Sequence, residues 1–471
     1  MTHPHQRVAD GQPPSAHPFW PSPTGRCRAR VTTQPPLFSK GERETTQNSS
    51  CVGTIVVMAR FHFKCIECGE ECNEDPNRFV CSHCAGKQEP GGTVRGVLEV
   101  VLKVLPTAWP HFRASDREFL YAFLPIAEER AIPPLPVGDT PLIEAPRLRE
   151  ELEMSNLFVK DDTRNPSGST KDRASLLVVA KAVEYGCDTV ATASTGNAAS
   201  ALAAVAAAAG LRAVVLVPAA APPAKLAQMQ SYGALVVPVD GTYDQAFELC
   251  TAACDQFGWY NRSTALNPFT IEGKKTAALE IAAAMTPDSP DAVLVPTGDG
   301  VILAGIAKGF RDLETGGLIK RRPRLIAIQP EGSSAIVQAV RSGADEAAPS
   351  PGATSIADSL TVETPRNAIG CLAEIRASEG GGVTVSDEAI LAAISRLARA
   401  SGVFAEPAGA AALAGLEAAL DEGLVNRDER IVLMVTGNGL KDVNAAARAL
   451  PPLEPVEASI EAVERAVSSW E

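Results

Sequence analysis

The chain has 471 residues, more than one ordinary domain needs, and 45% of them are hydrophobic, which is enough for a large core. Its formal net charge of −13 argues against general binding to nucleic acids or anionic membranes, because both need a basic surface. No apolar run approaches the roughly 20 residues of a membrane span, so we expect a soluble, cytoplasmic protein with no membrane partner and no nucleic-acid partner.

Residues 1–57 differ in composition from the rest of the chain. They are polar, rich in proline and without periodicity, which predicts a disordered extension. Patterned sequence begins at Met58. Two interpretations stay open, a real disordered tail and an incorrectly extended gene start upstream of Met58.

Four of the eleven cysteines form two C-x-x-C pairs within "CIECGEECNEDPNRFVCSHC". Two such pairs let four thiolates converge on one ion, and four sulfurs match tetrahedral zinc. The alternative is a pair of disulfides, which a cytosolic setting disfavours. We therefore predict a small zinc ribbon over residues 58–88 that holds a structural metal, followed by a connecting segment over residues 89–133. The predicted zinc ligands are Cys65, Cys68, Cys81 and Cys84.

From residue 134 onward, short β-branched runs alternate with alanine-rich helical stretches such as 197–210 and 272–285. This alternation predicts an α/β fold with parallel sheets that carry helices on both faces. Near-continuous apolar strands are typical of sheets buried on both sides. The predicted strands are 157–160, 189–194, 213–218, 235–240, 292–298, 324–330 and 431–437.

Three predicted strand-to-helix junctions are rich in glycine and polar residues. They are "TASTGNAAS" (192–200), "VPTGDGVILAG" (295–305) and "MVTGNGLKD" (434–442). Such turns free backbone N–H groups at a helix N-terminus, which is an anion-binding arrangement. Each is a weak signal alone, since ordinary caps and turns use the same residues.

The sequence lacks the residues that several common catalytic and nucleotide-binding sites need. No G-x-G-x-x-G fingerprint or P-loop is present, and all six histidines lie at or before residue 111. The α/β region therefore has no histidine for a Ser–His–Asp triad or a catalytic zinc site. Lys171, which follows the turn-forming run "NPSGST", favours chemistry in which a lysine forms an imine with an aldehyde such as pyridoxal phosphate.

The motifs "NPSGSTKDRAS", "STGNAAS", "PTGDG" and "TGNGLKD", in this order, resemble the signatures of the fold-type II pyridoxal-phosphate-dependent enzymes. The similarity covers about residues 134–450, and "GDTPL", "EGKKTAALE" and "SGVFAEPAGAAALAGL" add to it. The resemblance implies a tryptophan synthase β-like catalytic domain over residues 134–451. Its smaller parallel-sheet subdomain, about residues 175–270, would be inserted in the larger one. Residues 452–471 are expected to form a C-terminal helix.

The resemblance also implies residue roles. Lys171 would hold the cofactor covalently and later act as the general base at the substrate's Cα. Asn197 would hydrogen-bond the 3′ oxygen of the cofactor ring and Thr436 would face the ring nitrogen, although a helix cap and a strand-end hydroxyl are the ordinary alternatives. Ser194, Thr195 and Gly196 would grip the amino acid's carboxylate. The cofactor phosphate would be cradled by the backbone of Gly298, Asp299, Gly300, Val301 and Ile302, with the Asp299 side chain turned away or capping the helix.

Within the family, the last motifs and the zinc ribbon are most similar to threonine synthase. That reading implies a lyase of threonine biosynthesis that converts O-phosphohomoserine and water to threonine and phosphate, in an assembly that is often a homodimer. Thr270 stands where the family usually has a basic residue, so the ligand for the substrate's phosphate is open. Arg366 and Asn367 are candidates for reading the substrate's far end. The basic candidates for the phosphate are Lys160, Arg164, Arg173, Arg262, Lys274 and Arg366.

Two alternatives of the same fold are a threonine or serine dehydratase and a cysteate synthase-like enzyme. An alternative of another class is a zinc-ribbon binding module on an inactive enzyme scaffold. Production of threonine and phosphate from O-phosphohomoserine would separate these alternatives from a threonine synthase.

Overall fold

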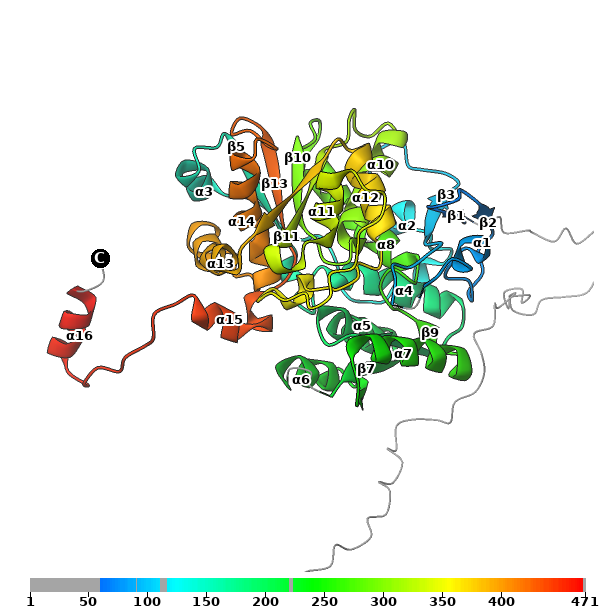
Figure 1. Cartoon of the computed structure of the whole chain (residues 1–471), viewed down its shortest axis with the longest axis horizontal. Helices are drawn as coiled ribbons and strands as arrows, with labels where there is room; N and C mark the ends of the chain where they lie inside the picture. Colours follow the sequence, from blue (N-terminus) through cyan, green and yellow to red (C-terminus); the bar gives the residue numbers. More distant parts are fainter. Residues whose placement is uncertain (1–59, 90, 111–116, 220–222, 469–471) are drawn as a thin grey trace, which may run out of the picture.

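The computed structural model describes residues 60–89, 91–110, 117–219 and 223–468, and the predicted disordered extension over residues 1–57 lies outside them. Within these residues the chain forms three sheets, and Figure 1 shows one in a large upper body, one in a lower body and one at the side. None of the described helices is long and apolar enough to cross a membrane.

The large body is built on a six-stranded sheet. Its strands are parallel except at one edge, where β4 runs antiparallel to β5. In spatial order they are β12 (Gly381–Val385), β11 (Arg324–Pro330), β10 (Ala292–Pro296), β13 (Arg430–Val435), β5 (Asn156–Asp161) and β4 (Leu142–Glu144).

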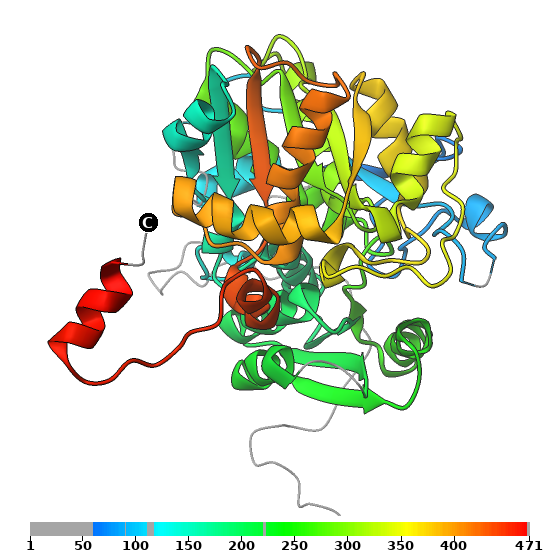
Figure 2. The same cartoon turned by 60° about the vertical axis from the view of Figure 1, so that its left-hand side comes forward.

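Both faces of this sheet are buried, because successive side chains of a strand point to opposite sides. On β13, Ile431, Leu433 and Val435 belong to one apolar cluster, whereas Val432 and Met434 belong to the other. Figure 2 shows α13 and α14, in orange, on the face that is turned to the viewer. The helices that pack on the face of Ile431, Leu433 and Val435 are α3 (Pro146–Glu151), α13 (Asp387–Ser401) and α14 (Pro407–Asp421). The helices that pack on the face of Val432 and Met434 are α8 (Phe269–Lys274), α9 (Thr276–Met285), α10 (Val301–Thr315), α11 (Ala335–Ser342) and α12 (Ala368–Ala377).

The second body lies in the chain between β5 and β10. Its four parallel strands are β8 (Leu235–Val239), β7 (Arg212–Pro218), β6 (Thr189–Ala193) and β9 (Tyr260–Asn261), in that spatial order. Four helices accompany them, α4 (Lys171–Glu184), α5 (Asn197–Ala209), α6 (Pro223–Ser231) and α7 (Tyr243–Phe257). Gly210 ends α5 in the left-handed region, with φ of +70°, which a residue without Cβ adopts at little cost.

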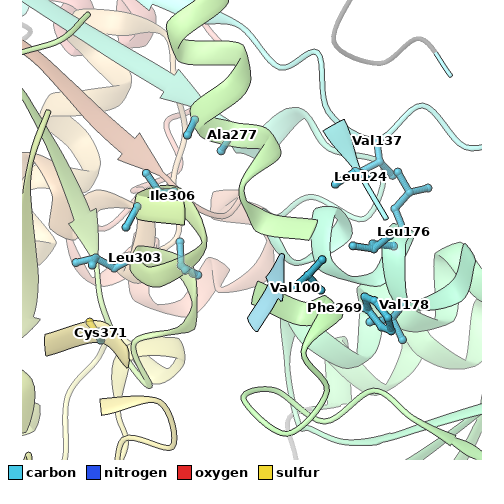
Figure 3. Close-up of a cluster of buried hydrophobic side chains, with 14 of the residues drawn as sticks. Val100, Leu124, Val137, Leu176, Val178, Phe269, Ala277, Leu303, Ile306 and Cys371 are labelled. Atoms are coloured by element: carbon cyan, nitrogen blue, oxygen red, sulfur yellow. The ribbon is translucent and has the colours of Figure 1, made fainter. Parts of the chain in front are cut away.

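The cysteine pairs lie in a small module beside these bodies (Figure 1). Its strands β1 (Phe61–Cys65), β2 (Glu71–Cys72) and β3 (Leu98–Leu102) form an antiparallel sheet, accompanied by the short helix α1 (Ser82–Ala85). The rings of Phe61 and Phe63 contact Phe269 of α8, at centroid distances of 5.8 and 5.7 Å. Figure 3 shows how Val100 of β3 joins Phe269, Leu176 and Val178 in one apolar cluster. The module therefore shares its core with the two larger bodies. It is followed by α2 (Arg117–Phe123) and η1 (Glu129–Ala131).

All seven strands predicted from the sequence are present, with ends shifted by at most two residues. The helix predicted over residues 272–285 is instead split at Lys275 into α8 and α9. After β13 the chain forms η5 (Gly439–Lys441), α15 (Val443–Arg448) and α16 (Ile460–Ser468), and Figure 1 shows α16 apart from the two bodies. The remaining short 3-10 turns are η2 (Asp162–Arg164), η3 (Glu331–Ser333) and η4 (Asp358–Leu360).

Candidate active site

Lys171 is the first residue of α4 and is aimed by the turn before it. The amide of Thr170 donates to the carbonyl of Thr436, at 2.9 Å, and the amide of Asn438 donates to the carbonyl of Gly168, at 3.0 Å. Gly168 has φ of +84°, which favours glycine at this turn. The "NPSGST" and "TGNG" motifs, more than 260 residues apart in sequence, therefore lie side by side at the carboxyl end of β13.

A cavity of about 520 Å³ opens at Lys171. Burial lowers the pKa of the Lys171 ammonium; Asp299 opposes this shift and Arg262 adds to it. A lysine with a lowered pKa holds a larger neutral fraction, which is the form that can attack a carbonyl or take up a proton. The cavity is lined by residues 192–198, 297–300 and 358–364, together with Lys171, Thr242, Arg262, Thr264, Ile302 and Arg366.

The glycine loop after β10 forms one wall of this cavity. Gly300 has φ of +87°, and a Cβ there would lie 2.7 Å from Cys371 Cβ, while a Cβ on Gly298 would lie 3.0 Å from the Ser359 carbonyl oxygen. The Asp299 carboxylate accepts from the Val301 amide at 3.2 Å, at the start of α10. Val301 is fully buried and does not line the cavity, whereas Ile302 does.

Asn197 is the first residue of α5 and also lines the cavity. Its Nδ2 donates to Glu406 Oε1 at 2.6 Å, and its buried Oδ1 has no hydrogen-bond partner among the described residues. Burial raises the pKa of Glu406, and Lys225, Lys441 and the Asn197 bond oppose that shift. Sequence alone offers no reason to single out Glu406, since an acidic residue before Pro407 at the first position of a helix has the pattern of an ordinary helix start.

The loop that is predicted to bind the substrate's carboxylate, residues 194–196, lies between β6 and Asn197. Ser194 and Thr195 are half-buried, Gly196 is buried, and all three line the cavity. The Gly196 amide donates to Ser194 Oγ at 3.2 Å. Lys225 of α6 reaches this loop and forms an ion pair of 2.6 Å with Asp358 of the large body. Nothing in the sequence links Lys225 with Asp358, so this contact between α6 and a lining residue of the cavity was not predicted.

Thr436 and Asn367 contribute through their backbones. Thr436 is buried and lies outside the lining, and its carbonyl holds the turn before Lys171. The Asn367 amide donates to the Asp299 carbonyl at 3.0 Å, so it supports the glycine loop. Its side chain is buried under Gly370 and is also outside the lining.

Two of the basic candidates for a substrate phosphate belong to a buried charge network. Lys160 Nζ lies 2.6 Å from Glu280, and Arg173 is paired with both Asp162 and Glu280. Thr140 Oγ1 donates to Asp162 at 2.8 Å. This network joins the "GDTPL", "TKDRAS" and "TAALE" segments, and Lys160 and Arg173 are outside the lining of the cavity. Arg164 is exposed.

The cysteine cluster lies in the side module. Cys65, Cys68, Cys81 and Cys84 offer sulfur atoms that all lie within 4.8 Å of one another. The Cys65–Cys84 and Cys68–Cys81 pairs have Sγ–Sγ distances of 3.8 and 3.7 Å. A tetrahedral ion with Zn–S bonds of about 2.3 Å needs sulfur atoms about 3.8 Å apart, so the spacing suits such an ion.

Comparisons with known proteins agree with this geometry. Residues 134–437 match the family model described as pyridoxal-phosphate dependent enzyme. The chain is 36% identical over 411 residues to a threonine synthase of Methanosarcina acetivorans, covering 86% of this chain and 98% of that protein. A threonine synthase of Methanocaldococcus jannaschii is 36% identical, covering 85% and 98%.

Solved structures show the same fold. A threonine deaminase of Solanum lycopersicum superimposes with a TM-score of 0.57 at 22% identity, covering 74% of this chain and 93% of that chain. A serine racemase of maize gives a TM-score of 0.56 at 22% identity, covering 70% and 92%. The architecture is the tryptophan synthase β-like fold, and the chain belongs to the pyridoxal-phosphate dependent enzymes.

Proposed function

We propose that this chain is a threonine synthase, a lyase that converts O-phosphohomoserine and water into threonine and phosphate with pyridoxal phosphate. The observation that carries the proposal is the similarity to the two threonine synthases over 98% of their length, in a chain whose Lys171 lines the cavity. A solved threonine deaminase shares the fold, but likeness at 22% identity supports no choice of substrate.

The cavity residues fit the cofactor. Asn197 Oδ1 is a buried polar atom without a partner among the described residues, and Asn197 lines the same cavity as Lys171, Gly298 and Gly300. Lys171 would hold the cofactor, and the loop over residues 298–302 at the N-terminus of α10 would bind its phosphate through backbone N–H groups. Thr436 would lie toward the ring nitrogen, from the strand end that holds the turn of Lys171.

Bound pyridoxal phosphate supplies an electron sink for the carbanion that forms at the substrate's Cα. In the proposed reaction Lys171 Nζ takes the proton from Cα and then one from Cβ, and phosphate leaves from Cγ. The proton taken from Cβ is returned to Cγ, which becomes the methyl group. The hydroxyl of water adds at Cβ while its other proton goes to the released phosphate, and Nζ returns the remaining proton to Cα. Ser194, Thr195 and Gly196 would orient the substrate by its carboxylate. The lowered pKa of Lys171 supports its role as a base, because the neutral amine is the form that accepts a proton.

Lys274 and Arg262 are the proposed ligands for the phosphate group of the substrate. Both are buried, and Arg262 lines the cavity. Lys274 Nζ has no hydrogen-bond partner in the part of the chain that the structure describes. Burial lowers the pKa of Lys274 well below its usual range, Lys171 and Arg262 lower it further, and Asp299 opposes the shift. An incoming dianion is the partner that such a group lacks.

The position of Lys274 supports this role. It lies four residues, one helical turn, after Thr270, where the family usually carries its basic residue. The substitution Lys274→Met should raise the KM for O-phosphohomoserine by about tenfold or more, because a hydrogen bond to a charged group is worth about 1.5–3 kcal/mol. If the dissociation constant of the cofactor rises instead, Lys274 serves the cofactor's phosphate.

The activity test offers O-phosphohomoserine, threonine, serine and O-phosphoserine separately and measures phosphate, threonine and 2-oxo acid. Phosphate and threonine in equal amounts from the first substrate are expected. A 2-oxo acid from threonine alone would contradict the proposal and indicate a dehydratase. Lys171→Ala should abolish turnover and the visible absorption of the lysine-bound cofactor, and Lys320→Ala, at an exposed lysine, should change neither.

We also propose that the four cysteines hold a structural zinc ion. Four sulfur ligands fill a tetrahedral coordination sphere and leave no position for a substrate. Thiols kept reduced for a metal are typical of the cytoplasm, which supports a cytoplasmic location. Metal analysis of the purified protein should find one zinc per chain.

A further inference from the structure

The cysteine module packs against α8 and α10, two helices next to the cavity. Val94 and Val97 of the module share a small apolar cluster with Ile271 of α8 and with Val301 and Ala304 of α10. Val301 follows the glycine loop that lines the cavity. The module therefore contacts the elements that carry this loop, and its own core continues into α8 (Figure 3).

Residues 92–97, which we call the strap, are tied to both cysteine pairs. The amide of Ile66, next to Cys65, donates to the Val97 carbonyl at 3.1 Å, and the Cys81 amide donates to the Gly96 carbonyl at 2.8 Å. Glu67, between Cys65 and Cys68, forms an ion pair of 2.7 Å with Arg95. The position of the strap is thus set by the geometry of the cysteine pairs.

The other end of the strap holds the segment that carries Arg366. Thr93 Oγ1 donates to the Pro365 carbonyl at 3.1 Å, and the Val94 amide donates to the Arg366 carbonyl at 3.0 Å. The Arg366 guanidinium donates to the Gly92 carbonyl at 2.9 Å. Both the backbone and the side chain of this cavity-lining arginine are therefore bonded to the strap, and its guanidinium also lies over the ring of Phe247, 5.4 Å from the centroid.

The same segment continues to the glycine loop. The Asn367 amide donates to the Asp299 carbonyl at 3.0 Å. The Asn367 carbonyl oxygen also packs closely on Gly300, because a Cβ added to Gly300 would lie only 3.0 Å from it. A continuous series of contacts thus runs from the cysteine pairs through the strap and Arg366 to the loop at the head of α10.

We propose that the metal-held cysteine module is a positioning element for the substrate end of the cavity. By fixing the strap, it holds Arg366 where it can bind the far end of the substrate. This inference rests on the proposed function, and it adds Arg366, which lines the cavity and was a candidate for reading the substrate's far end, to Lys274 and Arg262. Loss of the metal frees the cysteine pairs and with them the strap, so substrate binding weakens. Lys171 keeps its place, because the turn before it is held by Thr436 and Asn438 and not by the strap.

The test uses the full-length, cofactor-loaded protein and two variants. Cys68→Ser removes one metal ligand at an exposed position, and Thr93→Val removes the strap's hydroxyl bond without touching the metal. Thr286→Val is the matched control, because its hydroxyl donates to the Ala282 carbonyl at a similar 3.2 Å, away from the strap. Zinc content, KM, kcat and amide hydrogen exchange at residues 365–367 are measured for each.

Cys68→Ser should lose zinc, raise the KM for O-phosphohomoserine by about tenfold and speed exchange at residues 365–367, with kcat per bound cofactor within about twofold. Thr93→Val should keep its zinc, raise KM by about threefold and speed the same exchange, and Thr286→Val should do neither. Unchanged KM and exchange in Thr93→Val overturn the proposal, even where Cys68→Ser does not fold. Should the protein make no threonine at all, the proposed function fails, and exchange at residues 365–367 still decides whether the strap holds this segment.

Discussion

Replacing Gly300 with alanine should disrupt the glycine loop by two separate costs. The first is the backbone, because φ is +87° and a left-handed conformation costs a residue with Cβ about 1–2 kcal/mol. The second is steric, because the new Cβ would lie 2.7 Å from Cys371 Cβ and 3.0 Å from the Asn367 carbonyl oxygen. Overpacking of this kind costs about 1–3 kcal/mol, so the sum is about 2–5 kcal/mol.

Gly317 offers a matched control at the other end of the same helix, α10. Its φ is +73°, and a Cβ there would meet no atom within 4 Å. Gly317→Ala therefore carries only the backbone cost of about 1–2 kcal/mol. The difference between the two variants isolates the steric cost at the loop.

Two measurements check this reasoning. Denaturant unfolding of the cofactor-free proteins should show Gly300→Ala losing about 1–3 kcal/mol more than Gly317→Ala. Cofactor fluorescence titration should show binding weakened about tenfold to a hundredfold in Gly300→Ala alone, the equivalent of one lost hydrogen bond to a charged phosphate. Equal losses of stability would refute the steric argument, and unchanged cofactor binding would refute the assignment of this loop to the phosphate.

Two further predictions concern charged groups. Burial alone would raise the pKa of Glu280, but Arg173 and Lys160 outweigh burial and lower it to about 2. Because the pKa of Glu280 is lower in the folded than in the unfolded protein, ionisation of this carboxyl stabilises the fold at pH values above its unfolded pKa of about 4.3. That stabilisation is lost as the pH falls toward 2. Glu280→Gln should therefore lower the free energy of unfolding by about 3–5 kcal/mol at neutral pH. In denaturant titrations the difference in the free energy of unfolding between the variant and the natural protein should become smaller below a pH of about 4.3. A difference that stays constant with pH would contradict the assignment. Glu422→Gln, which removes an exposed pair with Arg341, is the control and should cost less than about 1 kcal/mol. Lys225→Met breaks the pair with Asp358, which lines the cavity, so steady-state kinetics should show a KM for the substrate raised by about threefold to tenfold with little change in melting temperature. An unchanged KM would show that the pair has no part in binding.

The strands could be predicted because parallel strands buried on both faces leave continuous apolar runs. β12 was missed because its sequence begins Gly381-Gly382, and glycine is depleted in strands. The structure gives a reason for the adjacent glycine, since a Cβ on Gly380 would lie 2.1 Å from the Leu325 carbonyl oxygen. Such close approach of two backbones depends on tertiary packing, which local sequence does not reveal.

Site residues could be predicted from the sequence only where a particular residue in a particular turn is rarely found for purely structural reasons. Lys171 and the glycine loop are such cases, and both line the same cavity. The charged residues are different, because sequence gives a charge and not its partner. Lys160 and Glu280 are 120 residues apart and pair at 2.6 Å, so Lys160 could not be separated from the phosphate candidates in advance.

The first turn of α4 explains why three adjacent charged residues have three different roles. Successive helical residues point about 100° apart, so Lys171, Asp172 and Arg173 diverge. Asp172 turns back to accept from the Ser167 amide at 2.6 Å, and burial raises its pKa to about 6, against the opposing bonds from Ser167. Arg173 enters the network of Asp162 and Glu280. These two anchors fix the rotation of the helix about its axis, and that rotation leaves the lysine one direction, into the cavity.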